Sequence, residues 1–235
     1  MKSGTSSDAG NTNIPAGNAT YVLDMTQQSP GWQQTAPMAA PRAYHNLTVL
    51  PDGNVLATGG ELTLDGSSIS QAVYQAEMWS AGPQTWTTLS LEQVPRLYHS
   101  TAVLMPDARV FVAGGGSAYP APDETAGEYY SPPYLFKGPR PTIASAPTTV
   151  PYGTQFVVQS PDATNIASIS LIRPGAATHQ FNQDARFLSL SFQKSGGVLT
   201  VQAPATSKLA PPGYYMLFLV NNNGVPSIAS FVKIQ

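Results

Sequence analysis

The sequence contains no cysteine among its 235 residues. This absence excludes disulfide bonds and thiolate metal sites. It also excludes any chemistry that needs a cysteine nucleophile or a cysteine cross-link within the chain.

Charged residues are scarce, since Asp, Glu, Lys and Arg together make up 10% of the chain. Eleven Lys and Arg oppose thirteen Asp and Glu, which leaves a formal net charge of −2 and no basic run that could neutralise phosphates. We therefore expect no nucleic-acid partner.

Long hydrophobic runs are also missing. No apolar stretch approaches the roughly 20 residues that are needed to span a bilayer. The start, MKSGTSSDAGNTN, has no apolar segment typical of a signal peptide. We expect neither a membrane span nor a signal peptide within this chain.

The residues that are present describe a globular protein, because 42% of them are hydrophobic. Many Ser, Thr, Asn and Pro residues and two Asn-x-Thr sequons, at Asn18 and Asn46, favour an extracellular or cell-envelope location. Residues 1–18 are rich in Ser, Gly, Asn and Asp without periodicity, which predicts a flexible tail or linker.

An internal repeat with a period of about 55 residues follows this segment. PRAYHN at 41–46 recurs as PRLYHS at 95–100. Offsets of 54 or 55 residues also relate Trp32 to Trp86, Pro51-Asp52 to Pro106-Asp107, and Gly59-Gly60 to Gly114-Gly115. Each copy contains short runs rich in Val, Leu and Thr between turn residues, which predicts hairpins. A repeat of this length with Gly-Gly and Trp is typical of kelch blades of a β-propeller, which we expect over residues 19–140.

A second pattern begins after the repeats. Alternating runs such as TQFVVQS, VLTVQA and YYMLFLVNNNG, separated by turn signals, predict a β-sandwich over residues 141–235. In the run 215–220, alternation places Tyr215, Leu217 and Leu219 on one face and the intervening residues on the other. Two repeats do not close a propeller, which needs at least about four blades, so we expect the chain to be incomplete.

Several segments occur in the order found in one protein family: PRLYHS, EYYSPPYLF, LIRPGAATHQFNQDARF and PPGYYMLFLVNNNGVPS. Together they resemble the carboxyl-terminal part of galactose oxidase and the glyoxal oxidases, which are copper radical oxidases. The resemblance runs from about Tyr21 to Gln235. It implies an all-β fold with a partial kelch propeller of about two blades, followed by an immunoglobulin-like Early-set sandwich.

The resemblance also implies a copper site. Tyr98 and His99 match the ligand pair of a late repeat, and His179 matches the histidine that a loop of the sandwich pushes into the propeller axis. Tyr98 would be the axial ligand and the proton acceptor, and the two histidines would be equatorial ligands. Imidazole and phenolate suit Cu(II). Three further polar residues are expected to brace the His179 loop: Asn182, Asp184 and Arg186.

The first Tyr-His pair differs in what the resemblance implies. Tyr44 matches an aromatic wall of the substrate cleft, and His45 matches a residue that is not a ligand. Successive side chains of a strand point to opposite faces, so two adjacent ligands can converge on one ion only at a bend or a strand end. We expect that geometry at Tyr98-His99 alone.

The missing cysteine bears on the implied activity, the oxidation of primary alcohols or aldehydes by O2 with release of H2O2. Oxidising an alcohol to an aldehyde removes two electrons, and copper accepts one. In this family the second acceptor is a tyrosine radical cross-linked to a cysteine, which cannot form within this chain. The resemblance implies an alcohol, aldehyde or carbohydrate substrate and further upstream blades.

Three hypotheses follow for the function of the chain. It is the terminal portion of a copper radical oxidase, with no turnover of its own. Alternatively, it is a non-catalytic kelch and sandwich module that binds a glycan or a protein. The third hypothesis is a structural component of the cell surface.

Overall fold

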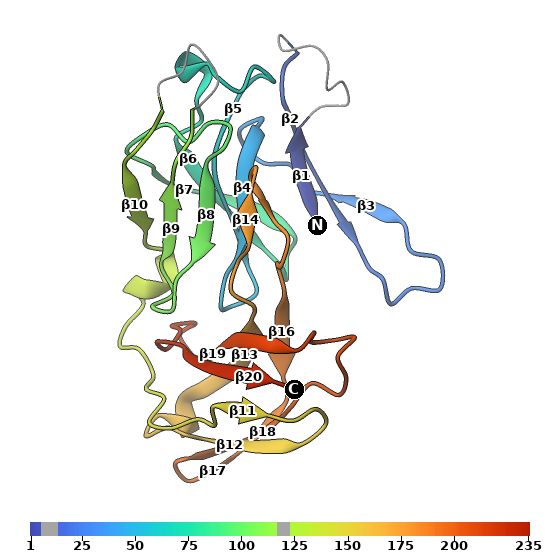
Figure 1. The fold of residues 1–235 in the computed structure, drawn as a ribbon, viewed down its shortest axis with the longest axis vertical. Coiled ribbons are helices and arrows are strands. Elements are labelled where there is room, and N and C mark those ends of the chain that lie inside the picture. Colours follow the sequence, from blue (N-terminus) through green and yellow to red (C-terminus); the bar gives the residue numbers. More distant parts are fainter. Residues whose placement is uncertain (6–13, 117–122) are drawn as a thin grey trace.

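The computed structural model describes residues 1–5, 14–116 and 123–235. Over these residues the chain is built from β-strands, with short 3-10 helices at Ile69–Gln71, Pro133–Phe136 and Ala163–Asn165. The all-β fold class is therefore confirmed. No helix in these ranges is long and apolar enough to cross a membrane. Figure 1 shows two stacked parts, with the repeat copies above and the two sheets of the carboxyl-terminal sandwich below.

The repeat copies form antiparallel sheets. The first copy makes a four-stranded sheet in the order β4 (Ala43–Val49), β5 (Val55–Glu61), β6 (Gln75–Ser80) and β7 (Thr85–Leu91). The second makes a three-stranded sheet of β8 (Thr101–Leu104), β9 (Val110–Ala113) and β10 (Gly127–Tyr130), with β9 in the centre. Gly59-Gly60 lies in β5 and Gly114-Gly115 directly follows β9, so both pairs belong to strands or strand ends, as the repeat predicts. The number of blades stays a prediction.

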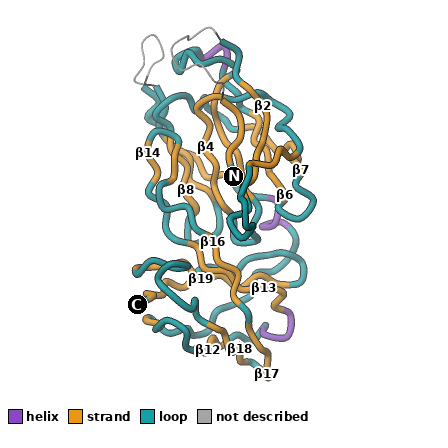
Figure 2. The backbone as a smooth tube through the Cα atoms, turned by 90° about the vertical axis from the view of Figure 1, so that its right-hand side faces the viewer, coloured by secondary structure: helices purple, strands orange, loops and turns teal. Residues whose placement is uncertain are grey.

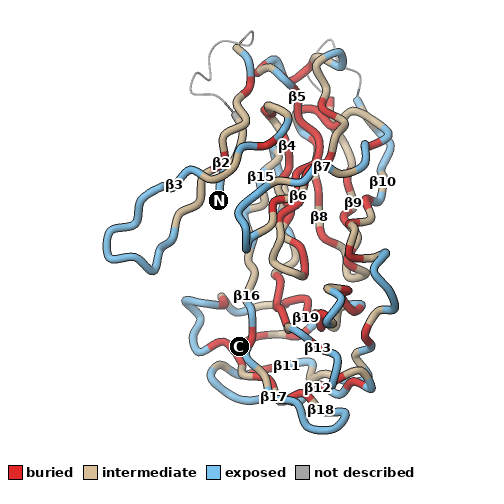
Figure 3. Tube along the Cα trace, turned by 180° about the vertical axis from the view of Figure 1, so that it is seen from behind, coloured by how far each residue is buried: buried red, intermediate tan, exposed pale blue. Residues whose placement is uncertain are grey.

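The first residues are more ordered than their composition predicts. Strand β1 (Lys2–Thr5) pairs with β2 (Gly17–Leu23), which pairs with the largely exposed strand β3 (Trp32–Thr35), as Figure 3 shows. The backbone N–H of Ala16 also donates to the carbonyl of Leu62 over 2.8 Å. The expectation of a flexible segment is wrong for these residues, because main-chain hydrogen bonds to distant parts of the chain fix them; residues 6–13 lie outside the described ranges.

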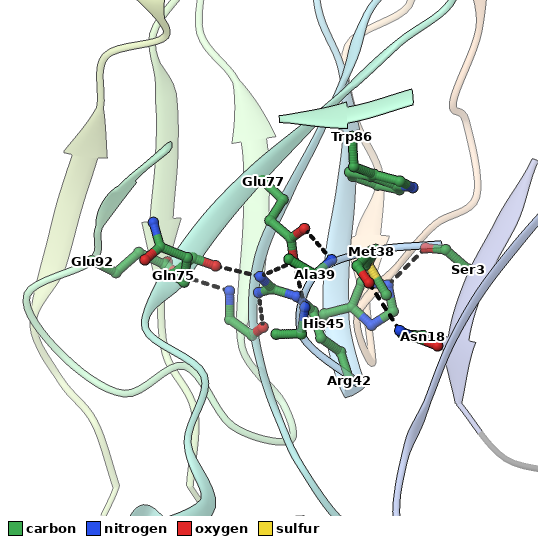
Figure 4. A network of polar contacts seen from close by, with 12 residues as sticks. Ser3, Asn18, Met38, Ala39, Arg42, His45, Gln75, Glu77, Trp86 and Glu92 are labelled. Carbon is green, nitrogen blue, oxygen red and sulfur yellow. Dashed lines mark hydrogen bonds and ion pairs between the residues drawn. The ribbon is translucent and has the colours of Figure 1, made fainter. Parts of the chain in front are cut away.

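The arginine of each Pro-Arg pair is buried and binds the same two kinds of partner within its copy. Arg42 donates to the carbonyl of Gly59 over 2.9 Å. It also donates to the Glu77 carboxylate over 2.7 Å, as Figure 4 shows. The matching contacts of the second copy join Arg96 to Gly114 and Glu128. The repeated PR and GG motifs are thus the two halves of one structural contact.

A further buried carboxylate, that of Glu92, lies beside the Arg42 network of the first copy (Figure 4). Its Oε2 accepts a hydrogen bond from the Gly59 N–H over 2.6 Å, whereas Oε1 has no partner among the described residues. Burial raises the pKa of Glu92 to about 7, against the opposing charges of Arg42 and Arg96. Glu92 is therefore a titratable group inside the folded repeats.

The carboxyl-terminal part is a sandwich of two sheets. One sheet has the order β11, β20, β19, β13, β16 and the other the order β12, β18, β17. Their bounds are Thr149–Val150 (β11), Gln155–Gln159 (β12), Ile166–Ile172 (β13), Phe187–Leu190 (β16), Phe192–Ser195 (β17), Val198–Gln202 (β18), Gly213–Asn221 (β19) and Ser230–Ile234 (β20). Buried side chains of both sheets, such as Val158 and Leu171, form one core.

Strand β19 is buried on both faces, and the predicted alternation explains why. Tyr215, Leu217 and Leu219 belong to the core of the sandwich. Met216 and Phe218 point the other way and join the core of the repeat copies. Alternate side chains of β19 therefore belong to two different cores. The strand lies between these cores and joins the two parts of the chain.

The Pro-Asp turns of both repeat copies contact the sandwich. The Ser170 hydroxyl donates to the carbonyl of Pro51 over 2.9 Å. The Ala229 N–H donates to the carbonyl of Pro106 over 2.8 Å. Because each copy is held by its own turn, the sandwich fixes both copies relative to the loop that it sends toward them.

Candidate metal centre

A hairpin of the sandwich delivers His179 to the repeat copies. Its strands, β14 (Ala177–Thr178) and β15 (Phe181–Asn182), are joined by the two-residue turn His179-Gln180. Figures 1 and 2 show β14 rising from the sandwich to lie beside β8, and β15 contacts β4. His179, at the tip of this hairpin, therefore belongs to the sandwich but lies against the repeat copies.

Both residues of this turn are left-handed, with φ of 51° at His179 and 59° at Gln180. Two-residue hairpin turns of type I′ require positive φ at both positions, which is why Asn-Gly is preferred there. A non-glycine residue in this conformation costs on the order of 1 kcal/mol. The turn thus keeps two large side chains at a position where glycine would be favoured.

Tyr98 and His99 lie in a turn directly before β8. The Ser100 N–H donates to the carbonyl of Leu97 over 3.0 Å, and His99 takes a φ of 66°. This bend brings the rings of Tyr98 and His99 to the same side, with centroids 3.9 Å apart. The geometry expected for two adjacent ligands is present here.

The first copy also has a bend, but this bend does not bring Tyr44 and His45 together; of the two pairs, only Tyr98-His99 has its rings side by side, as expected. There the left-handed residue is the tyrosine, Tyr44, with a φ of 57°. Its ring contacts Tyr98 edge to face at 5.1 Å, while His45 is buried elsewhere. Moving the bend by one residue separates the first pair, whereas the second pair stays together.

The three rings of the predicted ligand set converge. The His179 ring lies 5.0 Å from that of His99 and 5.9 Å from that of Tyr98. An imidazole nitrogen lies about 2 Å from a bound metal, so the centres of two coordinated rings are separated by roughly 4–6 Å. The spacing of the two histidines agrees with this range, and two imidazoles with a phenol form a donor set suited to Cu(II).

A hydrogen bond selects which nitrogen of His179 is available. The Thr178 hydroxyl lies 2.8 Å from His179 Nδ1, which leaves Nε2 as the nitrogen free to bind a ligand. His99 and His179 are exposed and Tyr98 is half-buried. In the described part of the chain, no three His, Cys, Asp or Glu side chains are grouped for metal binding, and the third donor of the predicted set is the Tyr98 phenol.

Tyr44 is fixed beside this cluster. Its hydroxyl donates to the carbonyl of Leu64 over 3.1 Å, and burial, with the nearby charge of Glu61, raises the pKa of its phenol. Gly66 lies under both tyrosines, since a Cβ there would be 3.4 Å from Tyr98 Cβ and 3.5 Å from the Tyr44 ring. The Tyr44 side chain is therefore neutral and is held in a fixed position next to Tyr98.

His45 contacts the amino-terminal strand and not the cluster, and Figure 4 shows it beside Ser3. Its Nε2 is 3.1 Å from the Ser3 hydroxyl, and its Nδ1 has no partner among the described residues. Burial, together with the charge of Arg42, lowers the pKa of His45 to about 3, so the ring is neutral. It also lines a cavity of about 420 Å³ with residues of β1, β4 and the hairpin.

The polar residues after His179 brace the loop, as predicted. Asn182 Oδ1 accepts hydrogen bonds from the N–H groups of Ala176 and Asp184, over 3.0 and 3.1 Å. Two further contacts tie the loop to the sandwich: Asp184 pairs with Arg173 over 3.4 Å, and Arg186 donates to the Leu209 carbonyl over 2.6 Å.

Sequence reasoning missed the two residues that flank His179. Thr178 contacts the imidazole itself, and the Gln180 side chain reaches the main chain of Ser100. The available signal was the turn, because ATHQFN joins two short strands through two residues without glycine or asparagine.

Comparisons with known proteins agree with this architecture. Residues 2–134 match the family model described as glyoxal oxidase N-terminus, and residues 140–234 match the galactose oxidase-like, Early set domain. A galactose oxidase of Gibberella zeae is 34% identical over 201 residues, covering 82% of this chain and 29% of the relative. The aldehyde oxidase GLOX of Vitis pseudoreticulata is 32% identical, covering 95% of this chain and 47% of the relative.

A solved structure is similar throughout. The chain of a fungal alcohol oxidase of the AA5 family, in complex with copper, superposes with a TM-score of 0.88 at 33% identity, over 95% of this chain and 49% of that chain. The present chain thus spans less than half the length of each of these three proteins. On its matching sequence and fold, the chain belongs to the galactose oxidase and glyoxal oxidase family of copper radical oxidases.

Proposed function

We propose that Tyr98, His99 and His179 bind a copper ion and that this site serves the oxidation of a primary alcohol or an aldehyde by O2. The observation that carries the proposal is the convergence of the three rings, two of which lie 5.0 Å apart although they come from different parts of the fold. The similarity to an alcohol oxidase that was solved with copper supports it.

The chemistry divides between the metal and the residues around it. Bound copper would supply a one-electron acceptor. Tyr98 would accept the proton of the substrate hydroxyl, which its oxygen can do only as a phenolate that becomes a phenol. Tyr44 forms one wall of the substrate cleft through its contact with the Tyr98 ring.

The full reaction transfers two electrons and two protons from an alcohol to O2 and gives H2O2. The chain has no cysteine, so a tyrosine-cysteine cofactor that accepts the second electron cannot form within it. We therefore propose that this chain is the carboxyl-terminal portion of such an oxidase. In this proposal residues 19–140 form kelch blades and residues 141–235 form an immunoglobulin-like sandwich. The proposed location is extracellular. Upstream blades would complete the active site.

A second candidate function is favoured by the same absence of cysteine. In this alternative the chain is a non-catalytic module that binds a glycan or a protein, and Tyr98, His99 and His179 are inherited residues that no longer hold copper. The two candidates differ in whether the site takes up copper.

Isothermal titration with Cu(II) tests the proposal, followed by an assay of H2O2 release from galactose and from glyoxal-type substrates. We expect one copper ion per chain and no turnover. Absence of copper binding would refute the site and favour the alternative. Turnover by the copper-loaded chain alone would contradict the assignment of the second electron to a cysteine-linked tyrosine.

A further inference from the structure

The side chain of Gln180 spans the gap between the two histidine-bearing segments. The amide orientation that satisfies both of its ends directs Oε1 toward the N–H groups of His99 and Ser100, at 2.9 Å from Ser100 N. The same orientation directs Nε2 toward the carbonyl of His179 at 3.1 Å. In the opposite orientation Nε2 donates to the Ser100 carbonyl over 3.3 Å, so both orientations join the hairpin to this turn.

The backbone of Gln180 is in an unfavourable conformation for its residue type. At φ 59° the residue occupies a left-handed position, where glycine or asparagine would cost less. His99, the residue that its amide faces, is also left-handed, with a φ of 66°. Gln180 and His99 are thus two non-glycine residues in left-handed conformations, and the side chain of one faces the backbone of the other. Such conformations persist where surrounding contacts hold them, and here those contacts include the neighbouring segment as well as the hairpin.

Other contacts act on the distance between the two imidazoles less directly, through the docking of the sandwich and the packing of β14 against β8 and of β15 against β4. Thr178 orients the His179 ring but belongs to the same hairpin. The remaining braces, through Asn182 and Asp184, also act within the loop of the sandwich. Gln180 differs because it links the hairpin directly to the backbone of the other histidine.

We propose that Gln180 is a positioning residue, which sets the spacing of His99 and His179 by bonding the main chain of both. The inference rests on the proposed copper site, because the spacing matters for a metal that both imidazoles bind. Outer contacts of this kind typically change metal affinity by about 10-fold to 100-fold.

Three variants distinguish the effect of the Gln180 amide from an effect on the folding of the hairpin. Gln180→Gly removes the side chain and leaves a residue that the left-handed turn favours, so the hairpin is retained. Gln180→Glu keeps an oxygen acceptor for the N–H groups of His99 and Ser100. Gln183→Ala is the matched control, since it removes an exposed glutamine of the same loop.

The variants are compared by Cu(II) titration and by electron spin echo spectroscopy, which counts coordinated imidazoles. We expect Gln180→Gly to bind copper about 10-fold to 100-fold more weakly, with a spectrum that reports fewer than two imidazoles. Gln180→Glu should recover most of the affinity and the two-imidazole spectrum, and Gln183→Ala should match the unmodified chain. In the copper-free chain, Gln180→Gly should speed hydrogen exchange at the His99 N–H, measured by NMR.

The outcomes separate the two proposals. If the unmodified chain binds copper through two imidazoles and Gln180→Gly does the same with equal affinity, the positioning role is wrong and the copper site stands. If the unmodified chain does not bind copper through two imidazoles, the proposed function is wrong, and the positioning role falls with it. Unchanged exchange at the His99 N–H would overturn the hydrogen bond itself.

Discussion

Replacing Glu92 with glutamine should make the repeat copies more stable at alkaline pH. The Glu92 carboxyl is buried, and its pKa is raised from 4.5 to about 7. The folded state therefore binds this proton more tightly than the unfolded state does. Protonated Glu92 contributes stability that is fully present below pH 4.5 and is lost as the pH rises through about 7.

The size of the effect follows from the shift. One pKa unit corresponds to about 1.4 kcal/mol, so the contribution that is lost is about 3 kcal/mol. A glutamine at this position cannot ionise, and its amide oxygen can still accept from the Gly59 N–H, which now bonds Glu92 Oε2 over 2.6 Å. Glu92→Gln should thus gain up to about 3 kcal/mol relative to the unmodified chain between pH 5 and pH 9.

The assay is the free energy of unfolding from denaturant titrations at pH 5, 7 and 9. At each pH, the free energy of unfolding of the unmodified chain is subtracted from that of the variant. The contributions of the other titrating groups are the same in both proteins and therefore cancel. Glu124→Gln, at a partly exposed carboxylate, is the control and should show no such trend. A difference for Glu92→Gln that stays constant from pH 5 to pH 9 would refute the reasoning.

Two further predictions concern the joint between the parts and the site. Phe218 is fully buried in the core shared with the repeats, so Phe218→Ala should lower the free energy of unfolding by about 3–5 kcal/mol, whereas Phe231→Ala on the neighbouring strand, 49% exposed, should cost far less. Equal losses would contradict the shared core. Thr178→Val removes the hydroxyl beside His179 Nδ1 and should weaken Cu(II) binding about 10-fold in a calorimetric titration. Thr178→Ser should restore it, and full affinity in the valine variant would show that the hydroxyl has no role.

The local patterns of the sequence predicted the strands well. The alternation in the run 215–220 identified the two faces of β19, because burial on each face leaves a period of two. The repeated Gly-Gly pairs located strands β5 and β9. These features depend on residues close together in the sequence, and the family resemblance supplied the pairing of Tyr98 and His99 with His179.

Contacts between distant segments could not be read from local patterns. Lys2–Thr5 has the composition of a linker, yet it forms a strand because β2 offers main-chain partners. The bend at Tyr44 accompanies the packing of its ring against Tyr98, which belongs to the next repeat copy. The amide of Gln180 reaches the backbone of Ser100, which is 80 residues away in sequence.

Electron paramagnetic resonance of the Cu(II)-loaded chain tests the central claim most directly, with His99→Ala and His179→Ala as losses and His45→Ala as the control. The account predicts one type of copper centre with nitrogen hyperfine coupling in the unmodified chain and in His45→Ala, since His45 lies apart from the cluster and bonds Ser3. Each of the other two variants should lose one nitrogen ligand and bind copper more weakly. Equal copper binding and identical spectra in all three variants would contradict the assignment of the site.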